Sequence, residues 1–452
     1  MVNWIPPDWE DAEMLKSLGI GTVEELFRDI PKRARMGRIG LQPSLDEASL
    51  AARVRGLLER NKPLSGYDIF LGGGFYDRYT PAVVDGILQR SEFYTSYTPY
   101  QAEASQGTLQ SLFEFQSLWV ELTNMEVANA SLYDGASALA EACLMALRLQ
   151  GEGKAILVPD NLLPAWREVL HSILGLQEIP LLGVPYDRQT GRLQLPEGEN
   201  DSAALIIPQI NAFGGLEAVD ALTDWAHARQ MLAIAVVNPL ALAILKAPGV
   251  WGQGGADLVV GEGQPLGIPL SAGGPFFGFL TCRKAHVRQM PGRLVARTVD
   301  AQGREGFCLT LQAREQHIRR GKATSNICTN QGLMVIAATI HMAALGGDGL
   351  RRTAVTCHRQ ARRLRDLLAD VPGVQWPFSG PFFHEFVLRL PLSAKAVRDA
   401  LLERGILAGI CLAEWGMGEA GDLLVCVTEL ASDADLLDYR DALLATLKDL
   451  SA

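Results

Sequence analysis

The residue that says most about the chemistry of this chain is Gln264, at the tip of a turn rich in glycine and proline. The turn runs from Gly263 to Pro275, and the apolar runs 257–260 and 277–280 flank it as short strand candidates. A lysine amine at such a tip could form a Schiff base with an aldehyde, whereas a primary carboxamide cannot. The sequence therefore predicts that this turn holds no aldehyde cofactor covalently.

Asn238 is the second position where an expected charged group is absent. It follows the apolar run 232–237 and precedes Gln264 by 26 residues. The pair resembles the centre of fold-type I enzymes that use pyridoxal phosphate (PLP), in which an aspartate about here keeps the pyridine nitrogen protonated. Neutral Asn238 can accept a hydrogen bond but cannot stabilise a pyridinium by charge. The loss of both groups predicts a disabled cofactor centre.

A possible phosphate site lies at Gly135, Ala136 and Ser137, which follow the strand-like segment 127–130 and open a helix. Small residues at the start of a helix expose backbone N–H groups, and the helix dipole favours an anion there. The phosphate of PLP would sit at this place in a working site. Tight packing of small residues explains the same pattern equally well.

Two further segments, 70–77 and 94–103, combine glycine or tyrosine with small polar residues. Glycine permits positive φ and close approach of the backbone, and tyrosine couples a rigid apolar ring to a hydroxyl group. Both properties suit a binding pocket or an interface, although packing in the core is the alternative. The residues expected there are Gly72, Gly73, Gly74, Tyr94, Tyr97, Thr98, Tyr100 and Gln101.

The elements that would position these residues fall into three regions. Residues 1–65 predict a helical extension, with short helices at 12–18 and 23–27 and a longer one from Ser44, its cap, to Asn61.

Residues 66–345 alternate between short apolar runs and amphipathic stretches, which predicts a large α/β domain with a mostly parallel sheet. The Gly-rich break 346–349 then separates a smaller α+β domain, residues 346–452, which begins with a helix at Leu350.

Composition narrows the class of protein. The chain has 452 residues, is 48% hydrophobic and carries a net charge of −10, which argues against a nucleic acid or an anionic membrane as partner. Its seven cysteines form no C-x-x-C pair and its histidines no close pair, so we expect a reducing, cytoplasmic location and no metal site. The most apolar window, 333–345, is too short to span a bilayer.

Together these segments resemble the glycine cleavage system P-protein family, and specifically the N-terminal subunit of its two-chain form. The resemblance extends from about residue 10 to the end. Its most specific parts are 70–74, 95–103, 128–142, 261–275 and 309–330.

The resemblance implies that a homologous second subunit carries PLP on its own lysine. Glycine then loses its carboxylate as carbon dioxide, and the aminomethyl group passes to the lipoyl arm of H-protein. This chain would bind no cofactor covalently, contribute no catalytic residue of its own and be inactive alone. We expect the loops 70–77 and 94–103 to face the partner and to close its site.

Two alternatives remain open at this stage. The chain could be a self-sufficient PLP enzyme that uses Lys246, Lys284 or Lys322, although their neighbours suggest solvated turns. It could also be a scaffold that only docks H-protein and assembles the complex.

Overall fold

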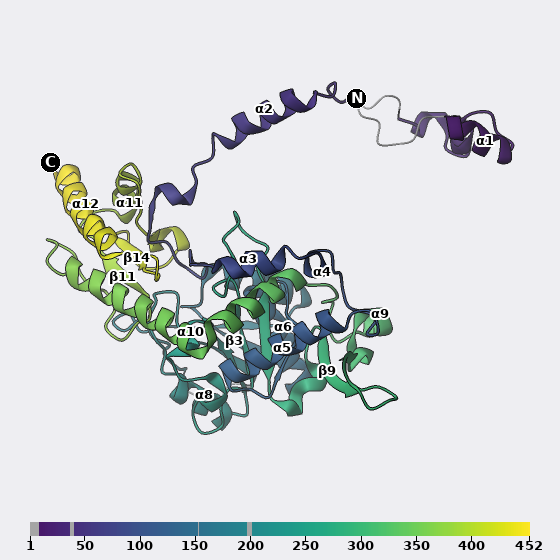
Figure 1. The fold of residues 1–452 in the computed structure, drawn as a ribbon. Helices are drawn as coiled ribbons and strands as arrows, with labels where there is room; N and C mark the ends of the chain where they lie inside the picture. Colours follow the sequence, from purple (N-terminus) through teal and green to yellow (C-terminus); the bar gives the residue numbers. More distant parts are fainter. Residues whose placement is uncertain (1–8, 37–39, 152, 197–200) are drawn as a thin grey trace. The chain divides into compact units, whose positions relative to one another are not determined.

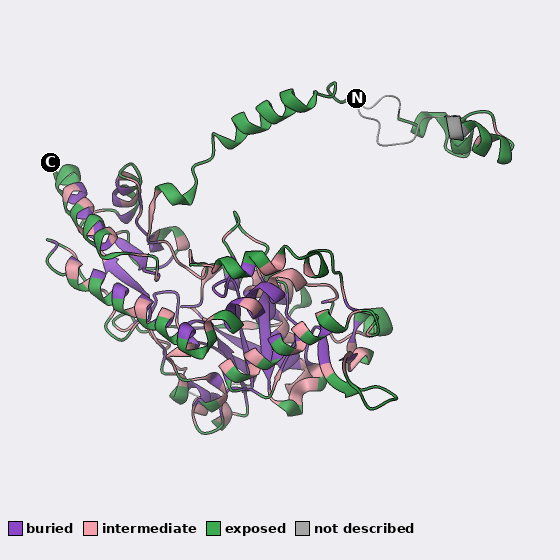
Figure 2. Cartoon of the chain, viewed as in Figure 1, coloured by how far each residue is buried: buried purple, intermediate pink, exposed green. Residues whose placement is uncertain are grey.

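The computed structural model describes residues 9–36, 40–151, 153–196 and 201–452, and the chain divides into two compact units, Met1–Gly66 and Tyr67–Ala452. No described residue of the first unit is buried, as the green helices of Figure 2 show. Its elements are α1 (Trp9–Ser17), α2 (Glu47–Leu58) and 3₁₀ helices at Val23–Phe27, Lys32–Ala34 and Leu64–Gly66.

The helix predicted from Ser44 to Asn61 is wrong at both ends. Helix α2 begins at Glu47, because Asp46 caps it and accepts a hydrogen bond of 2.9 Å from the Ser49 amide. Asp and Ser are both good caps, so the sequence alone does not decide which of the two starts the helix.

A seven-stranded sheet with the order β2-β8-β7-β6-β5-β3-β4 forms the centre of the second unit (Figure 1). Only β8 runs antiparallel to its neighbours, which confirms the mostly parallel sheet. The strands are β2 (Val127–Ala128), β3 (Ala155–Pro159), β4 (Leu181–Val184), β5 (Ser202–Pro208), β6 (Leu232–Val236), β7 (Leu258–Glu262) and β8 (Gly278–Cys282).

Helices cover both faces of this sheet, which is why its inner strands are continuously apolar rather than alternating. Alternate residues of β5 show the two faces: Leu205 and Ile207 pack with α5, α8 and α10 (Gly332–Leu368), whereas Ala204 and Ile206 pack with α6 and α7. Besides α10, the helices of this larger lobe are α3 (Ala82–Leu88), α4 (Ser91–Tyr94), α5 (Gln106–Thr123), α6 (Gly135–Gln150), α7 (Pro164–Leu174), α8 (Val219–Ala228) and α9 (Gln316–Arg319).

Shorter elements complete this part of the fold. A hairpin of β9 (Leu294–Val299) and β10 (Glu305–Thr310) packs on α5. The 3₁₀ helices of the second unit are Gly175–Gln177, Ala241–Ala243, Pro248–Val250, Lys284–Gln289, Gln312–Arg314, Arg320–Lys322 and Leu412–Trp415.

A smaller lobe with its own apolar cluster follows the large sheet. Its antiparallel sheet has the order β11-β14-β13, and a second, parallel pair joins β1 to β12, so a segment from before the large sheet belongs to the small lobe. Its elements are β1 (Asp68–Ile69), β11 (Glu385–Arg389), β12 (Ile406–Leu407), β13 (Ile410–Cys411), β14 (Asp422–Cys426), α11 (Ala394–Leu402) and α12 (Asp433–Ser451).

Helix α10 (Gly332–Leu368) connects the two lobes, packing on α5 and α3 near its start and on α12 near its end (Figure 1). Gly346 interrupts it with φ 61° and ψ 179°, a conformation that favours glycine. The predicted break is therefore a kink at one residue, and the helix resumes before Leu350. One window of α10 is apolar and long enough to cross a bilayer, but half of it is buried in this fold, as in a core helix.

Candidate functional site

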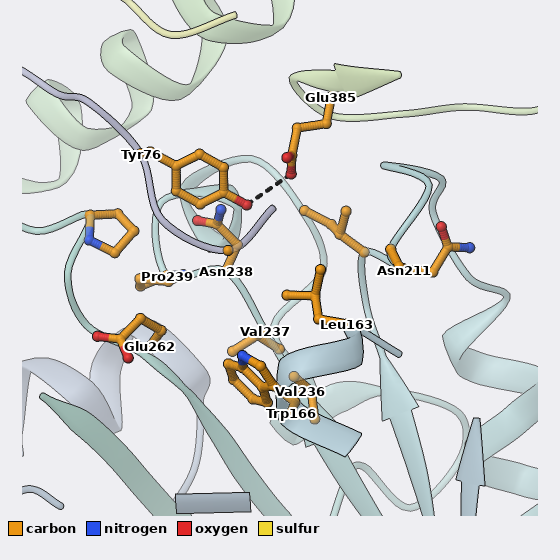
Figure 3. A pocket seen from close by; sticks show the side chains of 14 residues that line it. Tyr76, Leu163, Trp166, Asn211, Val236, Val237, Asn238, Pro239, Glu262 and Glu385 are labelled. Atoms are coloured by element: carbon orange, nitrogen blue, oxygen red, sulfur yellow. Dashed lines mark hydrogen bonds between the residues drawn. The ribbon is translucent and has the colours of Figure 1, made fainter. Parts of the chain in front are cut away.

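A small cavity lies where the carboxyl ends of β5, β6 and β7 meet, the edge at which parallel α/β sheets usually bind ligands. Figure 3 shows Tyr76 and Glu385 joined across one side of it, and Trp166 at the other. Its volume is about 60 Å³, whereas cofactor sites span roughly 300–1,000 Å³. The lining residues used below are Tyr76, Trp166, Asn238, Glu262 and Glu385.

The side chain of Gln264 makes three hydrogen bonds to backbone groups next to this cavity. Its Oε1 accepts from the Tyr76 amide at 2.9 Å, and its Nε2 donates to the carbonyls of Tyr76 at 2.9 Å and Ile268 at 2.8 Å. The residue is 1% exposed. A lysine amine could donate to the two carbonyls but could not accept from the Tyr76 amide. The side chain of Gln264 thus holds the loop 70–77 against the turn 263–275, a role that the local sequence did not indicate.

Asn238 lies at the end of β6, as predicted, but its amide serves the backbone. Its Oδ1 accepts from the Leu240 amide at 3.0 Å, the local bond by which asparagine stabilises a turn. Its Nδ2 lies 3.4 Å from Nε2 of the buried His384. The two carboxyl groups that line the cavity, those of Glu262 and Glu385, come from β7 and β11 and not from the end of β6.

The predicted phosphate site at the start of α6 already holds a carboxylate of the chain itself. Glu262 accepts from the Gly135 amide at 2.9 Å with Oε2 and from the Gln264 amide at 3.0 Å with Oε1. Asp134 caps the helix and accepts from the Ser137 amide at 2.7 Å, while Ala136 lines a neighbouring open pocket. Burial raises the pKa of Glu262 from 4.5 to about 7, although both amides favour the charged form.

The triple glycine is required by packing inside this chain. A Cβ on Gly72 would collide with the carboxylate of Glu385, and one on Gly73 would lie 2.8 Å from side-chain atoms of Ile410 and Trp415. Gly73 (φ 76°) and Gly74 (φ 107°) also adopt left-handed backbone conformations.

Glu385 holds this loop from the small lobe. It accepts from the Gly73 amide at 2.6 Å and from the Tyr76 hydroxyl at 2.8 Å (Figure 3). The loop 70–77 is thereby fixed over the cavity from two sides, by Gln264 and by Glu385.

Sequence reasoning missed a buried polar cluster next to this loop. The guanidinium of Arg78 pairs with Glu429 at 2.7 Å and lies 3.1 Å from Nε2 of His384. Burial, then the charge of Arg78, places the pKa of His384 well below its usual value, so the imidazole is neutral. Its Nδ1 lies 3.4 Å from Cys426 Sγ. Because more than 300 residues separate Arg78 from these partners, no local pattern could have found the cluster.

The loop 94–103 presents its aromatic side chains to solvent. Tyr94 is 69% and Tyr97 73% exposed, and Gln101 is also exposed. Tyr100 is held in place, because Arg293, whose side chain is 4% exposed, donates to its hydroxyl at 3.0 Å and lies over its ring.

A second cavity, of about 290 Å³, opens beneath this loop. Tyr97 and Thr98 form one side, and the hydroxyl of Thr329 lies 3.4 Å from a hydroxyl of each. The first turn of α10 and Arg293 also line this cavity. The structure thus brings Tyr97 and Thr98 together with Thr329, but no residue of the loop 94–103 lines the cavity that Glu262 and Glu385 border.

None of the three lysines considered as alternative anchors suits that purpose. Lys246, Lys284 and Lys322 are exposed, and none lines either cavity. Lys246 pairs with Asp220 at 2.8 Å on the surface.

Taken together, the residues around the first cavity do not fit PLP. The turn offers an amide in place of an amine, and the cavity itself has a volume of only about 60 Å³. Within the predicted phosphate site, Glu262 takes the Gly135 amide and Asp134 takes the Ser137 amide. Within the ranges that the structure describes, no group of three or more His, Cys, Asp or Glu side chains is arranged to hold a metal.

Comparison with known proteins identifies the family of this chain. The family model described as glycine cleavage system P-protein matches residues 3–443. The chain is 52% identical over 446 residues to probable glycine dehydrogenase (decarboxylating) subunit 1 of Nitrosomonas europaea, covering 97% of this chain and 98% of that protein. A protein of the same name from Coxiella burnetii is 52% identical over 97% of this chain and 99% of its own length.

Solved structures confirm the predicted fold class. The crystal structure of glycine decarboxylase (P-protein) of the glycine cleavage system, in inhibitor-bound form, has a TM-score of 0.91 at 44% identity and covers 98% of this chain and 100% of that chain. Glutamate decarboxylase of Lactobacillus brevis has a TM-score of 0.69 at 12% identity over 94% of this chain and 98% of that one, which shows a shared fold. The chain therefore has the fold of fold-type I PLP-dependent enzymes.

Proposed function

The chain belongs to the glycine cleavage system P-protein family, and we propose that it is the subunit of a two-chain P-protein that does not anchor PLP. A homologous second subunit would carry the cofactor on its lysine. The pair would release carbon dioxide from glycine and pass the aminomethyl group to the lipoyl arm of H-protein. PLP supplies the acceptor for the electron pair that remains when carbon dioxide leaves.

The side chain of Gln264 is the single observation that carries this proposal. It stands where the turn would present an amine, and all its hydrogen-bonding capacity except one acceptor site is used on the chain's own backbone. No lysine lines the cavity beside it. The name subunit 1 among the relatives supports a second, different chain in the same enzyme.

The loop 94–103 is the part of this chain that we propose to meet the partner's site. Its tyrosines Tyr94, Tyr97 and Tyr100 are 69%, 73% and 45% exposed, and their rigid rings with a polar hydroxyl suit burial at an interface. Buried against the partner, they would exclude water from the reacting carbanion and shape the entrance for the lipoyl arm. The loop 70–77 is held inside this chain by Glu385 and Gln264. Its role would therefore be structural, without contact to the substrate.

A labelling experiment tests the assignment of the cofactor. The purified chain, the purified partner and their complex are each incubated with PLP, reduced with borohydride and digested for mass spectrometry. We expect a reduced pyridoxyl group on the partner alone. A group on Lys246, Lys284, Lys322 or any other specific lysine of this chain would overturn the proposal. Full glycine turnover by the partner alone would instead favour the scaffold.

A variant at Tyr97 tests the role of the exposed loop. In the reconstituted pair, Y97A is expected to lower glycine-dependent exchange of carbon dioxide at least tenfold without releasing PLP, read from its visible absorbance. Leu176→Ala is the control, because Leu176 is 87% exposed and lines neither cavity. Equal turnover for Y97A and the control would remove the loop from the site.

The location in the cytoplasm is also a proposal. All seven cysteines are free thiols, which supports a reducing compartment.

A further inference from the structure

We infer that Glu262 is a built-in anion that occupies, in this chain, the place at the start of α6 where a phosphate group would otherwise bind. Its two carboxylate oxygens take one amide each, from Gly135 at 2.9 Å and Gln264 at 3.0 Å. The residue is 5% exposed. The inference deepens the proposed non-anchoring role, because it explains why the cofactor's phosphate finds no place here.

The donors of this arrangement are those that bind oxyanions in proteins. Backbone amides at the start of a helix point toward the ligand, and the dipole of α6, a helix of 16 residues, adds a positive potential. The Gly135 amide would be free at the first turn of the helix without Glu262. A carboxylate from the last residue of β7 supplies the acceptor, so the same geometry is reached without a ligand.

Trp166 also packs against the start of α6 at this place. A Cβ on Gly135 would lie 2.7 Å from the six-membered ring of Trp166 and 2.8 Å from the Glu262 amide. Trp166 is 6% exposed and borders both the first cavity and the open pocket next to Ala136. Glycine therefore permits the close contact of indole, helix and carboxylate at this helix start.

No cation neutralises Glu262 within the described ranges. It forms none of the ion pairs that the structure contains there, and neither pocket that it borders is lined by lysine or arginine. Backbone amides alone hold the carboxylate, as they would hold a phosphate. Burial raises the pKa of Glu262 to about 7, against the opposing effect of the two amides, so the group is mostly ionised above that pH.

Chemical rescue tests the inference on the isolated chain. Glu262→Ala vacates the place, and formate or inorganic phosphate should then bind to the freed amides. At pH 8.5 and constant ionic strength, we expect each anion to raise the melting temperature of E262A by roughly 2 °C or more beyond its effect on the wild type, relative to chloride. Asp134→Ala is the matched control, because it removes the other carboxylate of the same helix end but leaves the Gly135 amide bonded to Glu262.

Equal anion effects in E262A, D134A and the wild type would overturn the inference. If E262A does not fold, Glu262→Ser carries the same test, since it also leaves most of the space vacant. The measurement needs neither glycine nor a second subunit. Its failure would therefore leave the proposed function standing, and loss of turnover in the pair would leave this inference standing.

Discussion

Replacing Gln264 with alanine removes a side chain whose hydrogen bonds all go to backbone groups. The change leaves the amide and carbonyl of Tyr76 and the carbonyl of Ile268 without these partners, in surroundings where Gln264 itself is 1% exposed. A typical buried hydrogen bond contributes about 1 kcal/mol net, so Q264A should lose about 3 kcal/mol of stability. Against a total of about 5–15 kcal/mol for a folded domain, this loss is large.

Urea unfolding of the isolated chain, followed by tryptophan fluorescence and circular dichroism, measures this loss. Gln177→Ala is the control, because Gln177 is exposed and donates only to the Ile173 carbonyl at 3.0 Å. The control should change stability by at most about 0.5 kcal/mol. Gln264→Lys should be no more stable than Q264A, since the ammonium cannot accept from the Tyr76 amide and is buried. A loss below about 0.5 kcal/mol in Q264A would refute the view that Gln264 fastens the loop 70–77.

Three further predictions concern groups buried in the second unit. Glu262→Gln should flatten the pH dependence of stability, because the raised pKa of Glu262 means that the folded state binds its proton more tightly than the unfolded state does. The stability that this bound proton adds is full below pH 4.5 and is lost as pH rises through about 7. The difference is about 3 kcal/mol, and urea titrations at several pH values measure it. Parallel pH profiles for the two proteins would contradict this. Tyr76→Phe deprives the Glu385 carboxylate of a donor at 2.8 Å and should cost about 2 kcal/mol in the same assay, and an unchanged midpoint would show that this bond contributes nothing. Asp422→Asn breaks a bidentate pair with Arg389, at 2.6 and 2.8 Å, and should lower the melting temperature by several degrees, an effect that a calorimetric scan would either show or exclude.

Local patterns in the sequence predicted strands of the large sheet, since the runs 127–130, 232–237, 257–260 and 277–280 contain or overlap β2, β6, β7 and β8. Strand β5 illustrates why: all its residues are buried, so its apolar run is unbroken and marks a strand covered on both faces. The helix that starts at Gly135 and the turn around Gln264 were likewise readable, because glycine and proline restrict the backbone locally. Helix ends were less certain, as α2 shows, since Ser44 and Asp46 are both capable caps.

In the candidate site, too, some properties follow from local sequence and others from packing. That Gln264 cannot form a Schiff base with PLP, and that Asn238 cannot pair with its pyridinium by charge, follows from the residue types alone. What these residues and Glu262 do instead depends on contacts between distant parts of the chain. Gln264 binds Tyr76, 188 residues away, and Glu262 binds Gly135, 127 residues away. Contacts over such separations depend on the packing of the sheet, its helices and the small lobe, and no local sequence pattern records them.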